Sequence, residues 1–319
     1  MPIHPTTDLL SRRRVLLLAM GALLSACQSK PLQPATAAAP AATPPPPAAA
    51  ASAPVPVAVP KRPPKLGLAL GGGAARGFAH IGVIQVLEEA GIRPDLVVGT
   101  SAGSLVAALY AHGKTGAELA NLALTMDEGT ITDWAFPGRG LIRGDALARY
   151  VREQTGGKLI EQMKLRLGIV ATDLDSGAGV LFERGDTGQA VRASSSVPAV
   201  FLPVKIGDRE YVDGGLVSPV PVRYARQMGA EMVLAVDISS PPDGAATDGT
   251  MRLLLQTFAI MGKSINRFEL LGADVVLRPA LVGVSSADFT SRVRAIRSGR
   301  EMANAMLPEI KAKLAALAR

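Results

Sequence analysis

The chain has 319 residues, of which 48% are hydrophobic and only 4% aromatic, and its formal net charge is +7. This length suits one large domain or two ordinary ones, and the aliphatic content allows a sizeable core. Lys and Arg are scattered, whereas nucleic-acid binding needs them clustered, so no nucleic-acid partner is expected. A single Cys excludes an intrachain disulfide, and with only three His no metal site of the zinc type is expected.

The first 26 residues have the features of an export signal. Three arginines at positions 12–14 precede an uncharged apolar stretch, Val15 to Leu24, which is too short to span a bilayer. The stretch runs into Leu24-Ser25-Ala26-Cys27, which resembles a bacterial lipobox, a signal whose Cys becomes the lipidated first residue of the mature protein. We therefore predict lipidation at Cys27; the alternative is a buried thiol after an ordinary signal sequence.

This signal predicts an exported bacterial lipoprotein of the cell envelope, anchored to a membrane by its N-terminal lipid and facing the periplasm. Gln28 rather than Asp follows the Cys, which among such lipoproteins favours the outer membrane. The arginines fit either the general secretory route or the twin-arginine route. Buried acyl chains strengthen membrane binding by about 0.8 kcal/mol per CH₂ group, so a multiply acylated Cys would hold firmly.

Residues 27–65 are predicted to form a linker rich in Ala and Pro. Half of the chain's 24 prolines fall between residues 28 and 65. Such a segment cannot bury a core, and at about 3.1 Å per residue in polyproline II it could reach on the order of 100 Å. The folded domain is therefore predicted over residues 66–319.

Apolar runs and helical periodicity alternate along this predicted domain. One helix is expected from about Phe78 to a stop at Gly91, and another is expected to end at Gly113. The predicted buried strands are 66–70, 96–98, 167–172 and 232–237. Strands that alternate with helices indicate an α/β fold, in which helices cover both faces of a mostly parallel sheet.

A candidate nucleophile lies in Gly99-Thr100-Ser101-Ala102-Gly103, between a predicted buried strand and a predicted helix. Gly-x-Ser-x-Gly in this setting is the pattern of a nucleophile elbow, a sharp turn that exposes the serine hydroxyl above the sheet. The N-terminus of the following helix favours developing negative charge. Ser101 is therefore predicted to be the nucleophile; the alternative is a turn that only caps the helix.

A serine hydroxyl needs a base, and the histidines do not suit the usual order of Ser, Asp and His. No His follows His112, which lies about three helical turns beyond Ser101. His80 is better explained as a packed polar side chain near a helix start. A carboxylate is therefore expected to be the base. Asp173 and Asp237 each end a predicted buried strand, and Asp213 leaves a short apolar strand, Tyr211-Val212, into a glycine turn. The alternative for Asp213 is a simple Asp-Gly hairpin turn.

A glycine-rich loop, Gly71 to Gly77, follows the first predicted strand and opens the first helix. Its three successive glycines would let backbone N–H groups turn inward and meet an oxyanion. It is not a P-loop, because no Gly-Lys-Ser/Thr follows. A dinucleotide site would need its acidic residue at the end of the second strand, whereas Asp95 begins that strand. No cofactor is expected.

Taken in order, the glycine-rich loop, the Ser101 elbow and Asp213-Gly214-Gly215 resemble the bacterial branch of the patatin-like phospholipase family. Two further segments agree with it, Ala171 to Leu174 and Ser194 to Phe201. The resemblance covers about 250 residues, from the first strand to near the C-terminus. It implies a three-layer patatin-like fold with a mostly parallel central sheet flanked by helices.

The resemblance also implies a function. It implies a serine lipid acyl hydrolase of the phospholipase A or lysophospholipase type, in which Ser101 and Asp213 form a dyad and Asp173 is structural. The substrate would be a phospholipid or another lipid ester, or more narrowly a thioester or a short-chain ester, and no metal or cofactor would be needed. The alternative is a noncatalytic lipoprotein that binds lipid or a partner protein. The sequence indicates no oligomeric state.

The resemblance assigns the oxyanion hole to Gly71, Gly72, Gly73 and Ala74. Many relatives have one residue fewer between the glycines and the Arg-Gly pair, which leaves open which N–H groups point inward. Arg76 would either position an anionic phosphate or brace the loop. Leu141-Ile142 and Trp134-Ala135-Phe136-Pro137 are candidate lid or membrane contacts, with ordinary packing as the simpler explanation.

Overall fold

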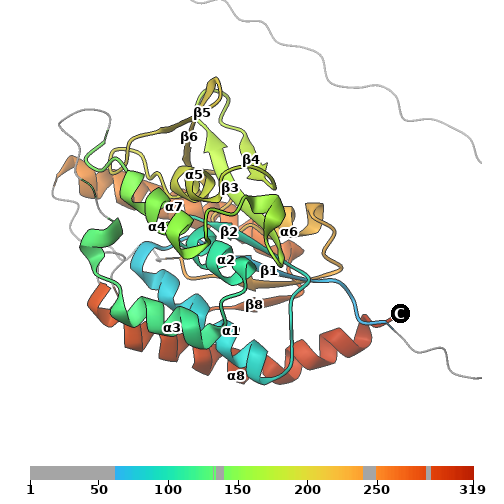
Figure 1. The fold of residues 1–319 in the computed structure, drawn as a ribbon. Helices are drawn as coiled ribbons and strands as arrows, with labels where there is room; N and C mark the ends of the chain where they lie inside the picture. Colours follow the sequence, from blue (N-terminus) through green and yellow to red (C-terminus); the bar gives the residue numbers. More distant parts are fainter. Residues whose placement is uncertain (1–61, 132, 134–139, 240–248, 285–288) are drawn as a thin grey trace, which may run out of the picture. The chain divides into compact units, whose positions relative to one another are not determined.

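The computed structural model describes residues 62–131, 133, 140–239, 249–284 and 289–319. The predicted export signal, Cys27 and nearly all of the predicted linker lie outside these residues. The centre is an eight-stranded sheet with hydrogen-bonded order β5-β6-β3-β2-β1-β7-β8, in which β4 also pairs with β3 (Figure 1). Its strands are β1 (Leu66–Leu70), β2 (Leu96–Thr100), β3 (Arg166–Asp173), β4 (Gly179–Phe182), β5 (Val204–Ile206), β6 (Arg209–Asp213), β7 (Met232–Val236) and β8 (Val275–Leu277).

The helices follow the strands in the order expected of an α/β fold. They are α1 (Phe78–Glu89), α2 (Ala102–His112), α3 (Gly116–Thr125), α4 (Asp145–Gln154), α5 (Thr187–Ser194), α6 (Val222–Gln227), α7 (Thr250–Glu269) and α8 (Arg292–Ala316). The predicted helix stops are confirmed, since Gly91 and Gly113 have φ values of 72° and 114° just after α1 and α2. None of the helices in the described part of the chain is both long and apolar enough to cross a bilayer.

The central strands β3, β2, β1, β7 and β8 run parallel to one another, as predicted. Helical crossovers such as β1–α1–β2 produce this arrangement. Between two parallel strands the chain must return along a face of the sheet before it can enter the next strand in the same direction. The antiparallel pairs lie at one side of the sheet, where β3 pairs with β4 and β6, and β6 pairs with β5.

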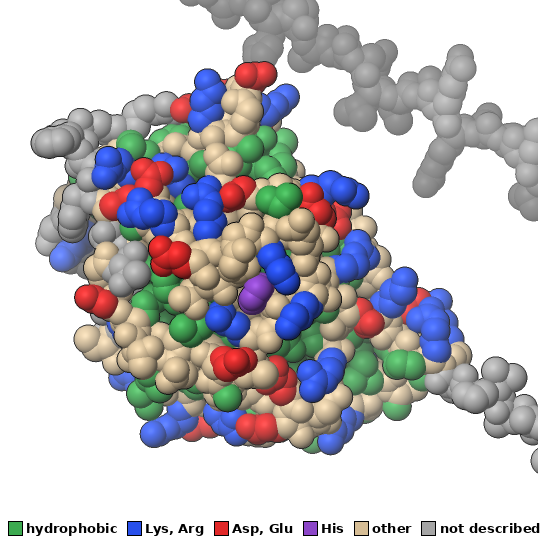
Figure 2. All heavy atoms as spheres, viewed as in Figure 1, with side chains coloured by type: hydrophobic (Ala, Val, Ile, Leu, Met, Phe, Trp, Pro, Cys, Tyr) green, Lys and Arg blue, Asp and Glu red, His purple; other side chains and the backbone are tan. Residues whose placement is uncertain are grey.

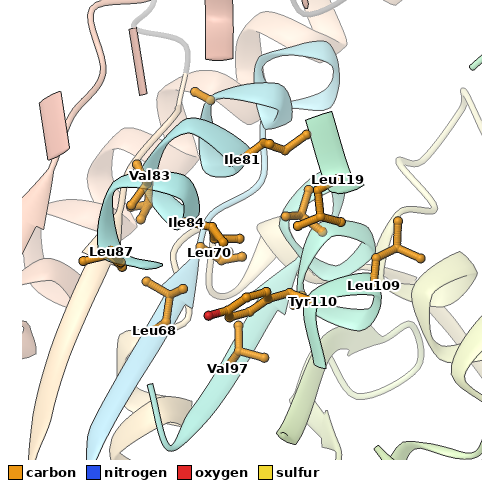
Figure 3. Close-up of a cluster of buried hydrophobic side chains, with 14 of the residues drawn as sticks. Leu68, Leu70, Ile81, Val83, Ile84, Leu87, Val97, Leu109, Tyr110 and Leu119 are labelled. Atoms are coloured by element: carbon orange, nitrogen blue, oxygen red, sulfur yellow. The ribbon is translucent and has the colours of Figure 1, made fainter. Parts of the chain in front are cut away.

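Side chains alternate between two apolar layers, one on each face of the sheet. Leu68 and Leu70 of β1 belong to the larger cluster, which packs against α1, α2, α3 and α8. Figure 3 shows this layer, with Leu68 and Leu70 facing Ile84 and Leu87 of α1. Ala69 points to the opposite cluster, which includes side chains of α6. The two clusters confirm the predicted three-layer arrangement of helices, sheet and helices.

Candidate active site

β3 positions the candidate site, because two strands share one of its edges. Val170 pairs with Thr100, the last residue of β2, and Ala171 pairs with Asp213, the last residue of β6. β4 takes the opposite edge, since it pairs with the same stretch of β3. β2 runs parallel to β3 and β6 antiparallel, so their carboxyl ends approach from opposite directions and stop at neighbouring positions. This places Ser101, which follows β2, beside Asp213.

The side chains of Ser101 and Asp213 are joined by a hydrogen bond. Ser101 Oγ donates to Asp213 Oδ2 at 2.7 Å, and the other carboxylate oxygen accepts from the Gly215 N–H at 2.7 Å. Asp213 is only 6% exposed. Burial raises the pKa of its carboxyl group from 3.8 to about 6, although the hydrogen bonds from Ser101 and Gly215 oppose the shift. The carboxylate is therefore a stronger base than an exposed aspartate and is still ionised at neutral pH.

Ser101 adopts the conformation expected of a nucleophile elbow. Its φ of 54° and ψ of −126° place a residue with a side chain in the left-handed half of the φ/ψ map, just before α2. A Cβ at Gly99 would lie 2.4 Å from the Gly103 carbonyl oxygen, and one at Gly103 would lie 2.2 Å from the Leu70 carbonyl oxygen. Both glycines are therefore required by close backbone approach. The unusual backbone conformation of Ser101 costs of order 1–3 kcal/mol, so surrounding contacts must hold it in place.

The last residue of α5 and the residues that follow it contact both Ser101 and Asp213. Ser194 Oγ accepts a hydrogen bond from the Ser101 N–H at 2.9 Å and donates one to the Val170 carbonyl at 2.5 Å. The Ser196 carbonyl accepts from the Asp213 N–H at 2.9 Å. In the sequence, this run of serines is a feature of the family resemblance, and no role is predicted for Ser194. The available signal, a serine at the end of a helix, does not reveal a partner 93 positions away.

The glycine-rich loop lies directly against Ser101. A Cβ at Gly72 would lie 3.1 Å from Ser101 Cβ. The Gly71 N–H donates to the Val236 carbonyl at 3.0 Å, and the Gly72 N–H donates to the Pro219 carbonyl at 2.9 Å. These two donors are thus engaged with neighbouring backbone. Within the predicted set, Gly73 and Ala74 are left as the candidates for an oxyanion hole.

Two buried side chains lie at this loop, His80 in α1 and Arg76 within the loop itself. His80 is fully buried, and its Nε2 donates to the Gly71 carbonyl at 2.8 Å. Burial lowers the pKa of His80 to about 4, so the ring is neutral at ordinary pH. Arg76 is 7% exposed, and burial lowers the pKa of its guanidinium while the nearby Asp237 opposes this. This buried position suits a side chain that braces the loop better than one that contacts a headgroup.

The competing carboxylates have other partners. Asp173 pairs with Arg209 at 2.7 Å and accepts hydrogen bonds from the Ser176 N–H and Oγ, which together hold the pKa of Asp173 well below its usual range. Asp237 lies 3.4 Å from the guanidinium of Arg278. Within the described residues, no three His, Cys, Asp or Glu side chains gather as a metal-binding group.

Of the candidate lid segments, the structure describes one. The N–H groups of Leu141 and Ile142 both donate to the Val200 carbonyl, at 2.9 Å each, and the Leu141 side chain is 47% exposed. The segment Trp134-Ala135-Phe136-Pro137 lies outside the described residues. Leu141 and Ile142 are therefore held by backbone hydrogen bonds to Val200, a few residues after Ser196.

Comparison with known proteins connects this geometry to a family. Residues 68–226, which include both Ser101 and Asp213, match the family model described as "Patatin-like phospholipase". The chain belongs to the patatin-like phospholipase family. The sequence therefore identified the family correctly from its three ordered motifs.

Curated relatives match part of the chain. An uncharacterized NTE family protein of Mycobacterium tuberculosis is 36% identical over 201 residues, which are 61% of this chain and 56% of that protein. Patatin-like phospholipase domain-containing protein 6 of Mus musculus is 35% identical over 184 residues, 55% of this chain and 14% of that protein. The chain thus spans about half the length of the mycobacterial relative.

A solved structure confirms the patatin-like fold. VipD from Legionella pneumophila superposes with a TM-score of 0.56 at 14% sequence identity, covering 78% of this chain and 68% of that one. At this identity the likeness concerns the fold alone. The predicted three-layer patatin-like architecture is therefore confirmed.

The strained backbone at Ser101 leads to a stability prediction. Ser101→Gly and Ser101→Ala both remove the hydroxyl, but only glycine adopts a φ of 54° without strain. Since the strain exceeds the extra chain entropy that glycine loses, we expect the Gly variant to be about 1–2 kcal/mol more stable than the Ala variant. Urea denaturation followed by circular dichroism measures the difference. Equal stabilities would contradict a strained elbow.

Proposed function

We propose that this protein is a serine lipid acyl hydrolase of the phospholipase A or lysophospholipase type, in which Ser101 and Asp213 act as a dyad. The observation that carries the proposal is the 2.7 Å hydrogen bond from the Ser101 hydroxyl to a buried carboxylate, at an elbow that opens a helix. Membership of the patatin-like phospholipase family supports a lipid ester as the substrate.

The dyad would transfer a proton as the serine attacks. Ser101 Oγ forms a bond to the ester carbonyl carbon while its proton passes to Asp213 Oδ2. When the tetrahedral intermediate collapses, the carbon–oxygen bond to the leaving alcohol breaks, and the alcohol takes the proton from Asp213. Water then attacks the acyl carbon as Asp213 accepts one of its protons. The bond from this carbon to Ser101 Oγ breaks, Oγ takes the proton from Asp213, and the fatty acid leaves with the hydroxyl and the carboxylate restored.

The negative charge that develops on the carbonyl oxygen needs donors beside Ser101. The N–H groups of Gly73 and Ala74 and the N-terminus of α2 are the groups that we propose for this role. Loss of one oxyanion donor typically raises the barrier by about 2.7–4 kcal/mol. Ala74 has a φ of 49°, so its backbone is held in an unusual conformation beside the site.

Lipidation at Cys27 would hold the catalytic domain close to its substrate. We propose that the mature protein is an exported lipoprotein of the bacterial cell envelope, anchored to the periplasmic side of a membrane, with the outer membrane favoured. The linker over residues 27–65 would let the domain reach lipids away from its anchor. Mass spectrometry of the N-terminal peptide would test this part of the proposal by itself.

The dyad predicts which variants lose reactivity. A fluorophosphonate should label Ser101 of the wild type, and Ser101→Ala should abolish both the labelling and the release of fatty acid from phospholipid vesicles. Asp213→Asn should lower both rates by about 10²–10⁴-fold, because the amide cannot accept the proton. Labelling is measured by in-gel fluorescence, and fatty acid release is measured by mass spectrometry.

His112 provides the control for this prediction, because it ends α2 at the far end from Ser101. His112→Gln should keep labelling and fatty acid release within about twofold of the wild type, because the change lies about three helical turns from the dyad. No labelling of the wild type would favour the noncatalytic lipid-binding alternative. Full activity of Asp213→Asn would contradict the dyad.

The contacts of Ser194 predict a positioning role for this residue. Ser194→Ala would remove the acceptor of the Ser101 N–H and the donor to the Val170 carbonyl. We expect kcat to fall by about tenfold or more with little change in KM, because the hydroxyl holds Ser101 and does not contact the substrate. Ser194→Thr, which keeps a hydroxyl, should recover part of the activity.

Ser196→Ala is the matched control. Ser196 is equally buried, but its Oγ donates to the Arg192 carbonyl at 2.8 Å. Its hydrogen bond to Asp213 is made by the backbone carbonyl, which the Ala variant keeps. We expect its kcat to stay within about twofold of the wild type, while its thermal stability falls about as much as that of Ser194→Ala. Equal losses of kcat in the two variants would contradict the positioning role.

A further inference from the structure

Helix α7 has almost no buried side chain. Asn266 is the buried residue among its twenty. A surface helix normally turns its large apolar residues toward the core. In α7 and at the residue just beyond its C-cap, six of them are instead exposed by 42–80%: Leu253, Leu255, Ile260, Met261, Phe268 and Leu271. Large apolar patches on a protein surface mark interaction sites.

Four of these side chains form a stripe along one side of the helix. At 3.6 residues per turn, Leu253, Ile260, Met261 and Phe268 fall within about 100° of arc, and we call these four residues the apolar stripe. The opposite side of α7 packs on the domain. There a Cβ at Gly262 would lie 3.5 Å from Pro219 Cγ.

Basic side chains flank the apolar stripe along one edge. Arg252, Lys263 and Arg267 lie on the adjoining sector of the same helix and are exposed. The one acidic residue of α7, Glu269, is turned inward, where it accepts hydrogen bonds from Ser218 Oγ and the Arg223 N–H. The outer side of α7 therefore carries three positive charges, and none of the three forms an ion pair with another residue of the described part of the chain. On the face shown in Figure 2, by contrast, Lys and Arg are interspersed with Asp and Glu.

α7 lies close to the candidate active site. It contacts the turn Gly214–Leu216 that follows Asp213. It also packs on Pro219, whose carbonyl accepts the hydrogen bond from the Gly72 N–H, and Gly72 lies against Ser101. One path of contacts from α7 to Ser101 therefore passes through only two residues, Pro219 and Gly72.

We propose that the outer side of α7 is a docking surface for a lipid bilayer that contains anionic lipids. The apolar stripe would enter the boundary between headgroups and acyl chains, and the basic flank would contact headgroup phosphates. Charge argues for this occupant, because an anionic surface neutralises the basic flank whereas a second copy of the chain would bring the same positive charges. The inference rests on the proposed function, since the docked bilayer would supply the lipid ester to Ser101.

A fluorescent probe on α7 tests this directly in the full chain. Cys27 is the only cysteine, so a Cys27→Ser background allows one new cysteine at a time to be labelled with nitrobenzoxadiazole. Ile260→Cys places the probe in the apolar stripe. Leu124→Cys on α3 is the matched control, because Leu124 is 51% exposed and Ile260 is 52% exposed. The probe reports its own surroundings, so membrane binding by the N-terminal segment does not produce the signal.

We expect the Ile260 probe to brighten at least about twofold and to shift to the blue with vesicles of phosphatidylcholine and phosphatidylglycerol. The Leu124 probe should not change. An unchanged Ile260 probe would overturn the proposal. A change that needs no vesicles and grows with protein concentration would also overturn it, because a second copy would then cover the apolar stripe.

Charge substitutions test the basic flank. Lys263→Gln combined with Arg267→Gln should weaken binding of the Ile260 probe protein to the anionic vesicles by about tenfold or more. Lys311→Gln combined with Lys313→Gln, on exposed positions of α8, should leave it within about twofold. Equal effects of the two pairs would overturn a specific role for α7.

Hydrolysis of soluble p-nitrophenyl butyrate separates this inference from the proposed function. The α7 variants should keep the wild-type rate on this ester. If the wild type hydrolyses this ester but the fluorescence of the Ile260 probe does not change with vesicles, only the proposed docking surface is wrong. A responsive Ile260 probe in a protein that hydrolyses no ester would overturn the proposed function and leave the docking surface supported.

Discussion

The hydrogen bond between Ser101 Oγ and Asp213 Oδ2 depends on the way in which two strands end on one edge of β3. The two residues are 112 positions apart, and β2 and β6 bring them together only because Val170 and Ala171 are their respective partners. A shift of either strand by one residue would turn its side chains to the opposite face of the sheet. The apolar layers on both faces fix the register, so the core also determines the geometry of the site.

The buried carboxyl group of Asp213 makes the folded chain less stable as the pH rises. Between about pH 3.8 and pH 6 the folded Asp213 binds a proton that the unfolded chain has lost, so the free energy of unfolding falls as the pH rises through this window. Above about pH 6 the raised pKa lowers the free energy of unfolding by about 3 kcal/mol. The same burial strengthens Asp213 as a proton acceptor. Hydrogen bonds from the segment Ser194 to Ser196 hold both residues in this costly arrangement.

The sequence predicted what local patterns determine. Apolar runs such as 66–70 reveal strands buried on both faces, and the glycines around Ser101 reveal the elbow. The sequence did not predict how β5 and β6 pair. β5 has only three residues, and the burial of β6 runs from exposed at Arg209 to buried at Asp213 without alternation, so neither strand has a periodic pattern. The glycines at 71–73 predicted a loop whose backbone N–H groups can turn inward, but not which of these groups do so. The family resemblance selected Asp213 among three carboxylates, and the structure gives the reason, since the other two face arginines.

In the proposed mechanism, a buried Asp213 with a pKa of about 6 takes the proton of Ser101. The decisive measurement is the pH dependence of fluorophosphonate labelling from about pH 5 to about pH 8, on the wild type and on Asp213→Asn. We expect the wild-type rate constant to rise with pH through one ionisation near pH 6 and then to level off, and this transition should be absent from Asp213→Asn. A wild-type rate that is flat over this range, or the same transition in Asp213→Asn, would contradict the claim.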